Sequence, residues 1–588
     1  MALFSPSESP AVVVKEIDLT GGVPNVQSTT GAIVGNFRWG PAEKRTLIAN
    51  ETELAERFGA PDSATTIDFH SASYFLRYSS ALQVVRTIDA TADNAISKSS
   101  DSAGVTPTAA VVKNEEDFEA QAAALTAATH TFIGRYPGSL GNDIQVQMCH
   151  ADDSAFANWA FKSEFDAKPA TSNYLTKKNG INDEVHAIIL DKDGKFTGTK
   201  NAVLERYSFL SLAKDAKAED GTSIYVKDVI NERSEYVHMA GFDSAVAANV
   251  TINGRFALDS GDNFLSSGAS NFKTPITFNF SGGSDCNSIG TAQIATGFDL
   301  FEDKDQVEID FLIAPSMVST TDQTTVVNDL IATAQSLRKD CVVVASPARD
   351  DVVGLTSASD IVTNVVATAD TFTKSSYLFN DGNFLKVYDK FNDQFINIPA
   401  ASSTAGLMAA TDINRAAWFS PAGSRRGQYL GITALAYTPT KGQRDTLYKA
   451  SVNPIANIPG AGVILFGDKT GLRRASAFDR INVRRLFLIL ERAISRAAEQ
   501  VLFEFNDEFT RAEFVNIIEP VLREVKGRRG ITDFRVVADA TNNTAAVIDR
   551  NEFKADIFIK PARSINYVTL SFVAVRTGVD FQEVVGTV

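Results

Sequence analysis

The sequence has few cysteines and histidines. Its 588 residues include three cysteines, Cys149, Cys286 and Cys341, which lie far apart and form no CxxC pair. This spacing excludes a disulfide scaffold and a multi-cysteine metal site. The five histidines show no HExxH or other ligand spacing; they are His70, His130, His150, His186 and His238. We therefore expect no metal, no cofactor and no catalytic residues.

Long hydrophobic runs and an excess of positive charge are also missing. No segment approaches the ~18 consecutive apolar residues that a membrane-spanning helix needs, and the first residues do not resemble a signal peptide. The chain carries 56 basic and 71 acidic residues, a net charge of −15, which is the opposite of the usual balance in nucleic-acid-binding proteins. We expect no membrane insertion, no direct contact with nucleic acid, and synthesis in the cytoplasm.

The charge is unevenly distributed along the chain. From Leu407 onward there are 25 basic and 19 acidic residues, a net charge of +6, so the preceding part carries −21. This asymmetry suggests two faces with different partners, although a solvated acidic surface would give the same numbers.

The remaining composition, 44% hydrophobic and 22% charged, is that of a globular protein. Strand and helix patterns alternate over 26–92 and again over 306–400, which predicts a middle α/β domain with a partly parallel sheet. Between them, 93–305 predicts an inserted β-rich domain, and 401–577 predicts an α+β domain. The fold class is therefore a multidomain mixture of α/β and α+β. The expected core elements are strands at Gly31–Gly35, Leu82–Ile88, Val307–Ala314 and Cys341–Ala345, and helices at Thr52–Phe58, Thr66–Tyr78, Thr324–Arg338 and Ser359–Thr371.

The C-terminal part contains the strongest helical pattern. Asp479 can cap a helix that reaches about Phe505, with an apolar stripe at near-ideal 3.6-residue spacing. Thr510 and Glu513 form a capping box for the next helix, which Pro520 should kink or split. Strands are expected at Phe534–Ala538, Ala555–Ile559 and Tyr567–Val575.

Both chain ends resemble single strands flanked by breakers. Residues 1–25 contain one β-rich run between prolines, and 578–588 contain another after Gly578. A lone strand cannot form a sheet by itself. Each must pair with a distant part of its own chain or be added to the sheet of a neighbouring molecule.

Two charged segments could carry function. Between Lys469 and Arg496 there are eight basic and two acidic residues, and Arg485, Arg492 and Arg496 share one helical face. This face could be solvated, or it could be a positive ridge that faces an acidic partner. It lacks the interleaved aromatic residues of a nucleic-acid site.

The segment Gly462–Thr470 resembles a Walker A loop. However, Asp468 separates its second glycine from the lysine, and a carboxylate there would oppose phosphate. We therefore expect a strand and a turn at this position, with an enzyme built on this loop as a weak alternative.

Several longer strings resemble the tail sheath proteins of contractile-tailed bacteriophages, especially those of T4-like myoviruses. The matching segments are Gly35–Ala42, Phe58–Pro61, Tyr136–Asn142, Asp340–Arg349, Tyr388–Asp393, Trp418–Gly423, Phe478–Phe487, Thr541–Thr544, Ile548–Phe553 and Pro561–Tyr567. The resemblance covers about three quarters of the chain and is weakest over 150–300.

The resemblance implies a structural subunit that forms hexameric rings, stacked helically around a rigid tail tube, and that contracts to drive this tube through the host envelope. It implies partners in the tail tube, baseplate and tail terminator proteins, a place in the virion tail and assembly in the host cytoplasm. The inner domain, built from both chain ends, would face the tube. A host-encoded contractile device, such as a phage-tail-like bacteriocin, is the main alternative, and an inert tube or capsid subunit is another.

This resemblance assigns expected roles to three sets of residues. The tube-facing candidates are Arg484, Arg485, Arg492 and Arg496. The candidates for arms that pair with neighbouring subunits are Val12, Val13, Val14, Ile17, Val579, Phe581, Val584 and Val585. The hinge candidates are Gly21, Gly22 and Gly578, where glycine permits large backbone changes.

Overall fold

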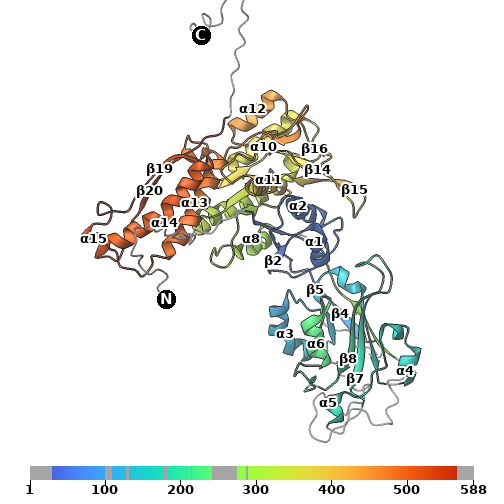
Figure 1. Cartoon of the computed structure of the whole chain (residues 1–588). Helices are drawn as coiled ribbons and strands as arrows, with labels where there is room; N and C mark the ends of the chain where they lie inside the picture. The colour runs from blue at the N-terminus through green and yellow to red at the C-terminus, as the bar shows by residue number, and fades with distance from the viewer. Residues whose placement is uncertain are drawn as a thin grey trace, which may run out of the picture. The chain divides into compact units, whose positions relative to one another are not determined.

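The computed structural model describes residues 29–99, 109–127, 131–151, 153–177, 182–213, 215–240, 275–286 and 289–565. The chain divides into two compact units. One contains residues 26–417 and 421–492, and we call it the core unit. The other contains residues 418–420 and the chain from residue 493 onward, and we call it the C-terminal unit (Figure 1).

A six-stranded sheet organises the core unit. Its strand order is β13-β12-β11-β1-β3-β2, and all neighbours are parallel except β2 and β3. The strands are β1 (Gly31–Gly35), β2 (Thr46–Ile48), β3 (Leu82–Arg86), β11 (Phe311–Ile313), β12 (Val342–Ala345) and β13 (Leu378–Asn380). The central strands are buried on both faces, as expected of a parallel sheet covered by helices.

Helices cover both faces of this sheet. Along β1, Ile33 packs into one apolar cluster and Val34 into another, because successive side chains of a strand point to opposite faces. Helices α2 and α11 contact the first face, and α8 and α9 contact the second. The core helices are α1 (Glu51–Phe58), α2 (Thr66–Leu76), α8 (Thr291–Asp299), α9 (Thr320–Ala332, continued by a π-helical turn Thr333–Arg338), α10 (Ala358–Thr371), α11 (Ala401–Asn414) and α12 (Lys441–Lys449).

Glycine in β1 permits a close helix–strand approach. A Cβ atom at Gly35 would lie 2.9 Å from the Asp68 side chain of α2, and one at Gly31 would lie 2.7 Å from the Phe75 ring. The first and last residues of this strand are therefore small because α2 packs directly against them.

Two small sheets complete the core unit. A three-stranded sheet has the order β15-β14-β16, and a two-stranded sheet pairs β17 with β18. Their strands are β14 (Phe384–Asp389), β15 (Gln394–Pro399), β16 (Ala434–Leu435), β17 (Ile455–Ile458) and β18 (Gly462–Leu465).

The predicted β-rich insertion forms a seven-stranded antiparallel sheet with the order β8-β7-β6-β10-β4-β5-β9. The strands are β4 (Asn94–Ser99), β5 (Phe132–Pro137), β6 (Ile144–His150), β7 (Glu184–Asp191), β8 (Ala202–Ser211), β9 (Val237–Met239) and β10 (Ile276–Ser281). The accompanying helices are α3 (Glu115–Ala127), α4 (Asp153–Asn158), α5 (Asn173–Thr176) and α6 (Val226–Arg233). Although α8 lies inside the range 93–305 predicted for the insertion, it packs against β1 and β3 of the core sheet.

The long helix α13 (Ile481–Glu499) begins in the core unit and continues into the C-terminal unit. The remaining elements of that unit are α14 (Glu508–Gly527), β19 (Ile531–Val537), α15 (Ala545–Ile548) and β20 (Asp556–Pro561), with β19 and β20 antiparallel. The buried side chains of α14 are Phe514, Ile518, Leu522 and Val525, which recur at helical spacing.

The structure corrects four predictions about this region. The predicted C-terminal domain starts at 401, but the division into units falls at 492, because α11 packs on β11, β12 and α2 of the core unit. Helix α13 stops at Glu499 instead of Phe505. Its last turn tightens into bonds between residues three apart, and Phe503 then adopts a left-handed φ of +70°.

Helix α14 also differs from the prediction. Asp507, rather than Thr510, caps the helix by accepting a hydrogen bond from the Thr510 N–H at 2.8 Å. Pro520 lies inside this helix without dividing it. No helix in the described part of the chain is both long and apolar enough to cross a membrane.

Candidate functional site

Arg484 and Arg485, predicted to face the tail tube, are buried inside the core unit. The Arg484 guanidinium lies over the rings of Tyr377 and Phe478, with its Cζ atom 4.4 and 4.1 Å from the ring centroids. Arg485 donates a hydrogen bond to the Met408 carbonyl at 2.9 Å. Its guanidinium lies 3.9 Å from the Asp412 carboxylate. Burial lowers the pKa of both arginines.

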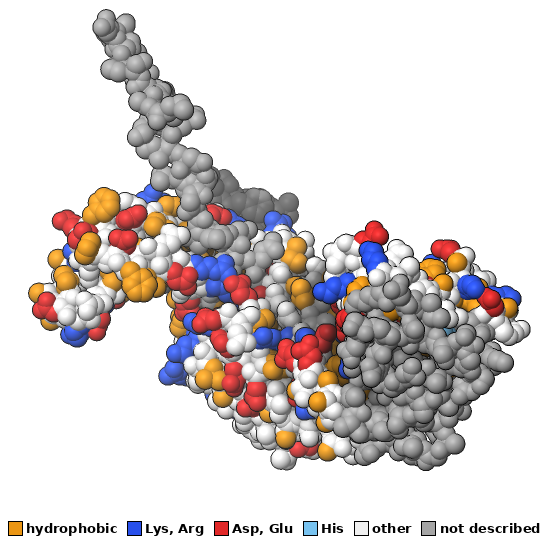
Figure 2. All heavy atoms as spheres, turned by 90° about the horizontal axis from the view of Figure 1, so that it is seen from below, with side chains coloured by type: hydrophobic (Ala, Val, Ile, Leu, Met, Phe, Trp, Pro, Cys, Tyr) orange, Lys and Arg blue, Asp and Glu red, His pale blue; other side chains and the backbone are white. Residues whose placement is uncertain are grey.

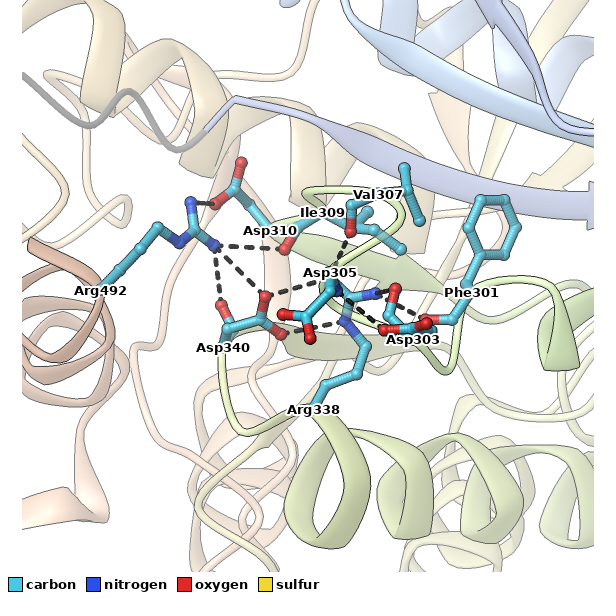
Figure 3. A network of polar contacts seen from close by, with 9 residues as sticks. All are labelled: Phe301, Asp303, Asp305, Val307, Ile309, Asp310, Arg338, Asp340 and Arg492. Carbon is cyan, nitrogen blue, oxygen red and sulfur yellow. Dashed lines mark hydrogen bonds and ion pairs between the residues drawn. The ribbon is translucent and has the colours of Figure 1, made fainter. Parts of the chain in front are cut away.

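Arg492 is held at the amino edge of the core sheet (Figure 3). Its Nη1 atom donates to the Asp310 carboxylate at 2.8 Å, and Nη2 donates to the carbonyls of Ile309 at 3.3 Å and Asp340 at 3.0 Å. Asp310 directly precedes β11, and Asp340 lies two residues before β12. Because these two strands are parallel neighbours, their starting points lie at the same edge of the sheet, next to one another.

Asp310 also fixes the start of β1. Its carboxylate accepts a hydrogen bond from the Thr30 N–H at 3.0 Å, while its own N–H donates to the Thr30 carbonyl at 2.9 Å. Burial raises the pKa of the Asp310 carboxyl, and Arg492 only partly offsets this rise. One buried carboxylate therefore ties the point where the chain enters the core sheet to the helix that leads out of the core unit.

Arg338 extends this network to the loop before β11 (Figure 3). It forms a two-pronged contact with the Asp340 carboxylate, at 2.9 Å from Nε and 3.0 Å from Nη2. It also donates to the carbonyls of Phe301 at 2.6 Å and Val307 at 2.8 Å. We call Arg338, Asp340, Arg492 and Asp310 the anchor network. Sequence analysis identified Arg492 but missed its partners, whose only signal is an aspartate before each of two apolar strands.

The prediction of an exposed positive ridge is therefore wrong for Arg484, Arg485 and Arg492, because their guanidinium groups are occupied by contacts within the chain. Arg496 is half-buried and lies in the part of α13 that belongs to the C-terminal unit. The arm and hinge candidates fall in 1–28 and 566–588, outside the described residues.

The opposite edge of the core sheet, where parallel α/β proteins commonly bind ligands, is filled by the protein's own polar groups. Asp381, directly after β13, accepts hydrogen bonds from the hydroxyls of Ser346 at 2.9 Å and Thr404 at 3.2 Å. The Ser346 hydroxyl in turn accepts the N–H of Ala401 at the start of α11, at 2.9 Å. Burial raises the pKa of Asp381 to about 7.

The Walker-like segment forms a strand, as the sequence predicts, but the predicted turn is wrong: the chain after the strand is irregular and Lys469 makes an isolated bridge with Arg480. Strand β18 ends at Leu465, and the Lys469 ammonium donates to the Tyr448 carbonyl at 2.7 Å. Asp468 pairs with Arg480 at 3.0 Å. Within the ranges that the structure describes, no group of three or more His, Cys, Asp or Glu side chains could hold a metal ion.

Comparisons with known proteins agree with this architecture. Residues 287–471 match the family of the phage tail sheath protein central domain, and residues 474–574 match the phage tail sheath C-terminal domain. The chain is 33% identical to the tail sheath protein of Enterobacteria phage T4 and 32% identical to that of Vibrio phage KVP40, each over 98% of this chain and 99% of the relative. It also shares its fold with the sheath tail protein of Listeria innocua, with a TM-score of 0.51, 11% identity, and coverage of 92% of this chain and 97% of that one.

The fold is thus that of a multidomain sheath subunit. The chain belongs to the tail sheath proteins of contractile phages, which confirms the family resemblance, and it is a structural component of the phage tail and not an enzyme.

The anchor network predicts a large stability difference between two arginine variants. Arg492→Ala would leave the buried Asp310 carboxylate without its cation, whereas Asp340 would keep Arg338. The change should lower the free energy of unfolding by about 3–5 kcal/mol. The matched control is Arg523→Ala, which removes an exposed pair with Glu519 along α14 and should cost under about 1 kcal/mol. Urea unfolding of the monomers followed by circular dichroism measures both. Equal midpoints for the two variants would mean that the network does not hold α13.

A second prediction concerns pH. The carboxyl of Asp381 has a pKa of about 7 in the folded chain and about 3.9 when unfolded. Between pH 4 and 7 the folded chain retains a proton that the unfolded chain has lost. Stability from this group should therefore fall as pH rises, by up to roughly 1.4 kcal/mol per pH unit, and level off above pH 7.

Asp381→Asn should remove this component and flatten the curve of unfolding free energy between pH 5 and 7. Asp360→Asn, an exposed change in α10, should leave the curve unaltered. Parallel curves for wild type and Asp381→Asn would contradict the assignment.

Proposed function

We propose that this protein polymerises as stacked hexameric rings around the tail tube, and that the resulting sheath contracts irreversibly to drive the tube through the host cell envelope for genome delivery. The observation that carries this proposal is the full-length relationship to phage tail sheath proteins. Assembly would take place in the host cytoplasm, with the tail tube, baseplate and tail terminator proteins as partners.

The sheet of the C-terminal unit supports pairing between subunits. Among the described strands, β19 and β20 have only each other as neighbours. Two strands are marginally stable alone, and their outer edges offer unpaired backbone groups to an added strand. Phe558 on β20 is also largely exposed. The apolar runs around Val13 and Val584 would supply such strands to neighbouring subunits.

In this proposal the arms keep the lattice connected while subunits move as nearly rigid bodies. Gly21, Gly22 and Gly578 would act as hinges, since glycine adopts backbone angles that other residues rarely adopt. The energy would be stored in the extended lattice, with no nucleotide hydrolysis. The contacts of Lys469 and Asp468 within the chain support this last point, because a phosphate-binding loop needs both a free lysine and no competing carboxylate.

Three of the four arginines predicted to face the tail tube are no longer candidates for this surface. The internal contacts of Arg484, Arg485 and Arg492 argue against a role for these three residues at the tube. We retain Arg496 as a tube-facing candidate because it is partly exposed. A contact that the sheath must release on widening would be polar, with each exposed charge pair worth about 0–1 kcal/mol.

Removal of residues 1–20 tests the arm proposal. The truncated chain should remain a folded monomer, because the described core unit begins at residue 29, but it should lose tube formation. Electron microscopy of negatively stained protein, alone and with purified tail tubes, measures assembly, and circular dichroism measures folding.

The matched control replaces residues 1–20 with a flexible stretch of the same length, which restores the length of the chain but not its apolar run. It should fail to assemble as the truncation does. Regular tubes from either variant would reject the arm proposal.

A further inference from the structure

The loop between α13 and α14 exposes a group of large apolar side chains. Leu502, Phe503, Phe505 and Phe509 are 60%, 106%, 84% and 77% exposed. We call residues 502–509 the aromatic loop. Isolated exposed apolar residues are common, but a contiguous group of this kind marks an interaction site. Figure 2 shows apolar and acidic side chains next to one another on the C-terminal unit, at the left of the view.

The backbone of the aromatic loop is strained at Phe503, whose ring is the most exposed in the loop. Phe503 has a φ of +70°, a conformation that is unfavourable for a bulky residue and costs free energy. A turn at this position would form more easily with glycine or asparagine. Phe503 therefore does not stabilise the monomer. Burial of its ring in a partner would explain why a phenylalanine occupies this position.

The acidic residues around the aromatic loop favour a partner surface that carries positive charge. Glu499, Glu504, Asp507 and Glu508 are all exposed within ten residues of sequence. An apolar surface with an acidic rim is complementary to an aromatic surface that carries positive charge.

The β14–β15 hairpin of the core unit combines exposed aromatic rings with the positive charge of Lys386. Its second lysine, Lys390, pairs with Glu51 at 2.9 Å, and its exposed Asp393 accepts a hydrogen bond from the Tyr388 hydroxyl at 2.6 Å. Tyr388 and Phe395 face each other across the two strands with ring centroids 5.4 Å apart, and both are about half exposed. The Lys386 ammonium lies 5.5 Å from the centre of the Phe395 ring. Phe391 at the tip is also exposed, next to Lys390. In the described part of the chain, this hairpin and the aromatic loop are the two places where three exposed aromatic rings lie within ten residues of one another.

We propose that the aromatic loop of one subunit docks on the β14–β15 hairpin of a second copy of this chain. This inference rests on the proposed function, since the two surfaces are different and their contact is heterologous. Heterologous contacts that do not close into a ring generate helical polymers, which is the geometry of a sheath. The tail tube is the competing occupant of the aromatic loop.

Charge reversal tests the contact in the full-length chain. Glu504→Lys combined with Glu508→Lys, or Lys386→Glu alone, should each raise the protein concentration needed for tube formation at least tenfold. Joining the two sets of changes in one chain should restore assembly to within about threefold of wild type, because opposite charges then face each other again. Sedimentation of assembled tubes measures this concentration. Equal assembly of all variants, or no rescue in the combined variant, would overturn the proposal.

The variant Phe503→Gly tests whether Phe503 contributes to docking and not to the stability of the folded monomer. Glycine accepts a φ of +70° without strain, so the monomer should melt at the same or a higher temperature while assembly weakens. Phe505→Ala should weaken assembly in the same way. The matched control is Phe466→Ala, which changes a half-exposed phenylalanine outside both surfaces and should assemble like wild type. A Phe503→Gly variant that assembles normally would also overturn the proposal.

Cross-linking identifies the occupant. Chains with Glu504→Cys are mixed with chains carrying Lys386→Cys and treated with a short bismaleimide, the three natural cysteines being buried. Linked dimers should form only in the mixture and only after assembly. If wild-type protein forms no tubes, alone or on tail tubes, the proposed function itself fails. If it forms tubes and the mixed chains do not link, or the loop cysteine links to the tail tube instead, only the present inference fails.

Discussion

A buried carboxylate, that of Asp310, determines how the chain enters and leaves its core sheet. It accepts the Thr30 N–H where the chain enters β1, and it pairs with Arg492 where α13 leaves the core unit. Charges removed from water are stable only when their partners are well placed. This requirement gives the arrangement a single geometry, since a shift of either partner would leave a charge in the interior.

The two edges of the core sheet use polar groups in different ways. At the amino edge, Arg338 and Arg492 join the starts of neighbouring strands and the loop before β11 through charged contacts. At the carboxyl edge, Asp381 and its hydroxyl partners fill the space where a ligand would bind in a related α/β architecture. The polar groups described at both edges are engaged by hydrogen bonds and ion pairs within the chain.

Sequence patterns predicted the helices and strands that depend mainly on residues near one another in the sequence. Strand β1 matches its predicted range because a short apolar run between glycines can only be a strand buried on both faces. The end of α13 was missed because the apolar period continues to Phe505 while the backbone turns at Phe503. Pro520 was expected to kink or split a helix. Helix α14 is not split there, and Ile518 and Leu522 are buried on either side of the proline.

The candidate site was harder to predict because its partners are distant in sequence. A helical pattern places Arg485 and Arg492 on one face, but it cannot reveal that Asp310, 182 residues away, lies opposite Arg492. Patterns of charge alone do not distinguish an arginine that faces a partner from one that pairs within the chain. The roles of residues at the two chain ends depend on other subunits, so no property of the single chain could establish them.

Helix α13 connects the internal anchor to the exposed loop. Its first part carries Arg484, Arg485 and Arg492, which bind the core unit, and the chain beyond its last turn exposes Phe503 and Phe505. An α-helix is a continuous rod because each turn is hydrogen-bonded to the next. If a neighbouring subunit pulls on the aromatic loop, that force reaches the core through α13 and ends at the Arg492–Asp310 pair. Removing Arg492 would leave a buried charge unpaired at this point, which is unfavourable, so the pair favours one position for this end of α13 on the core unit.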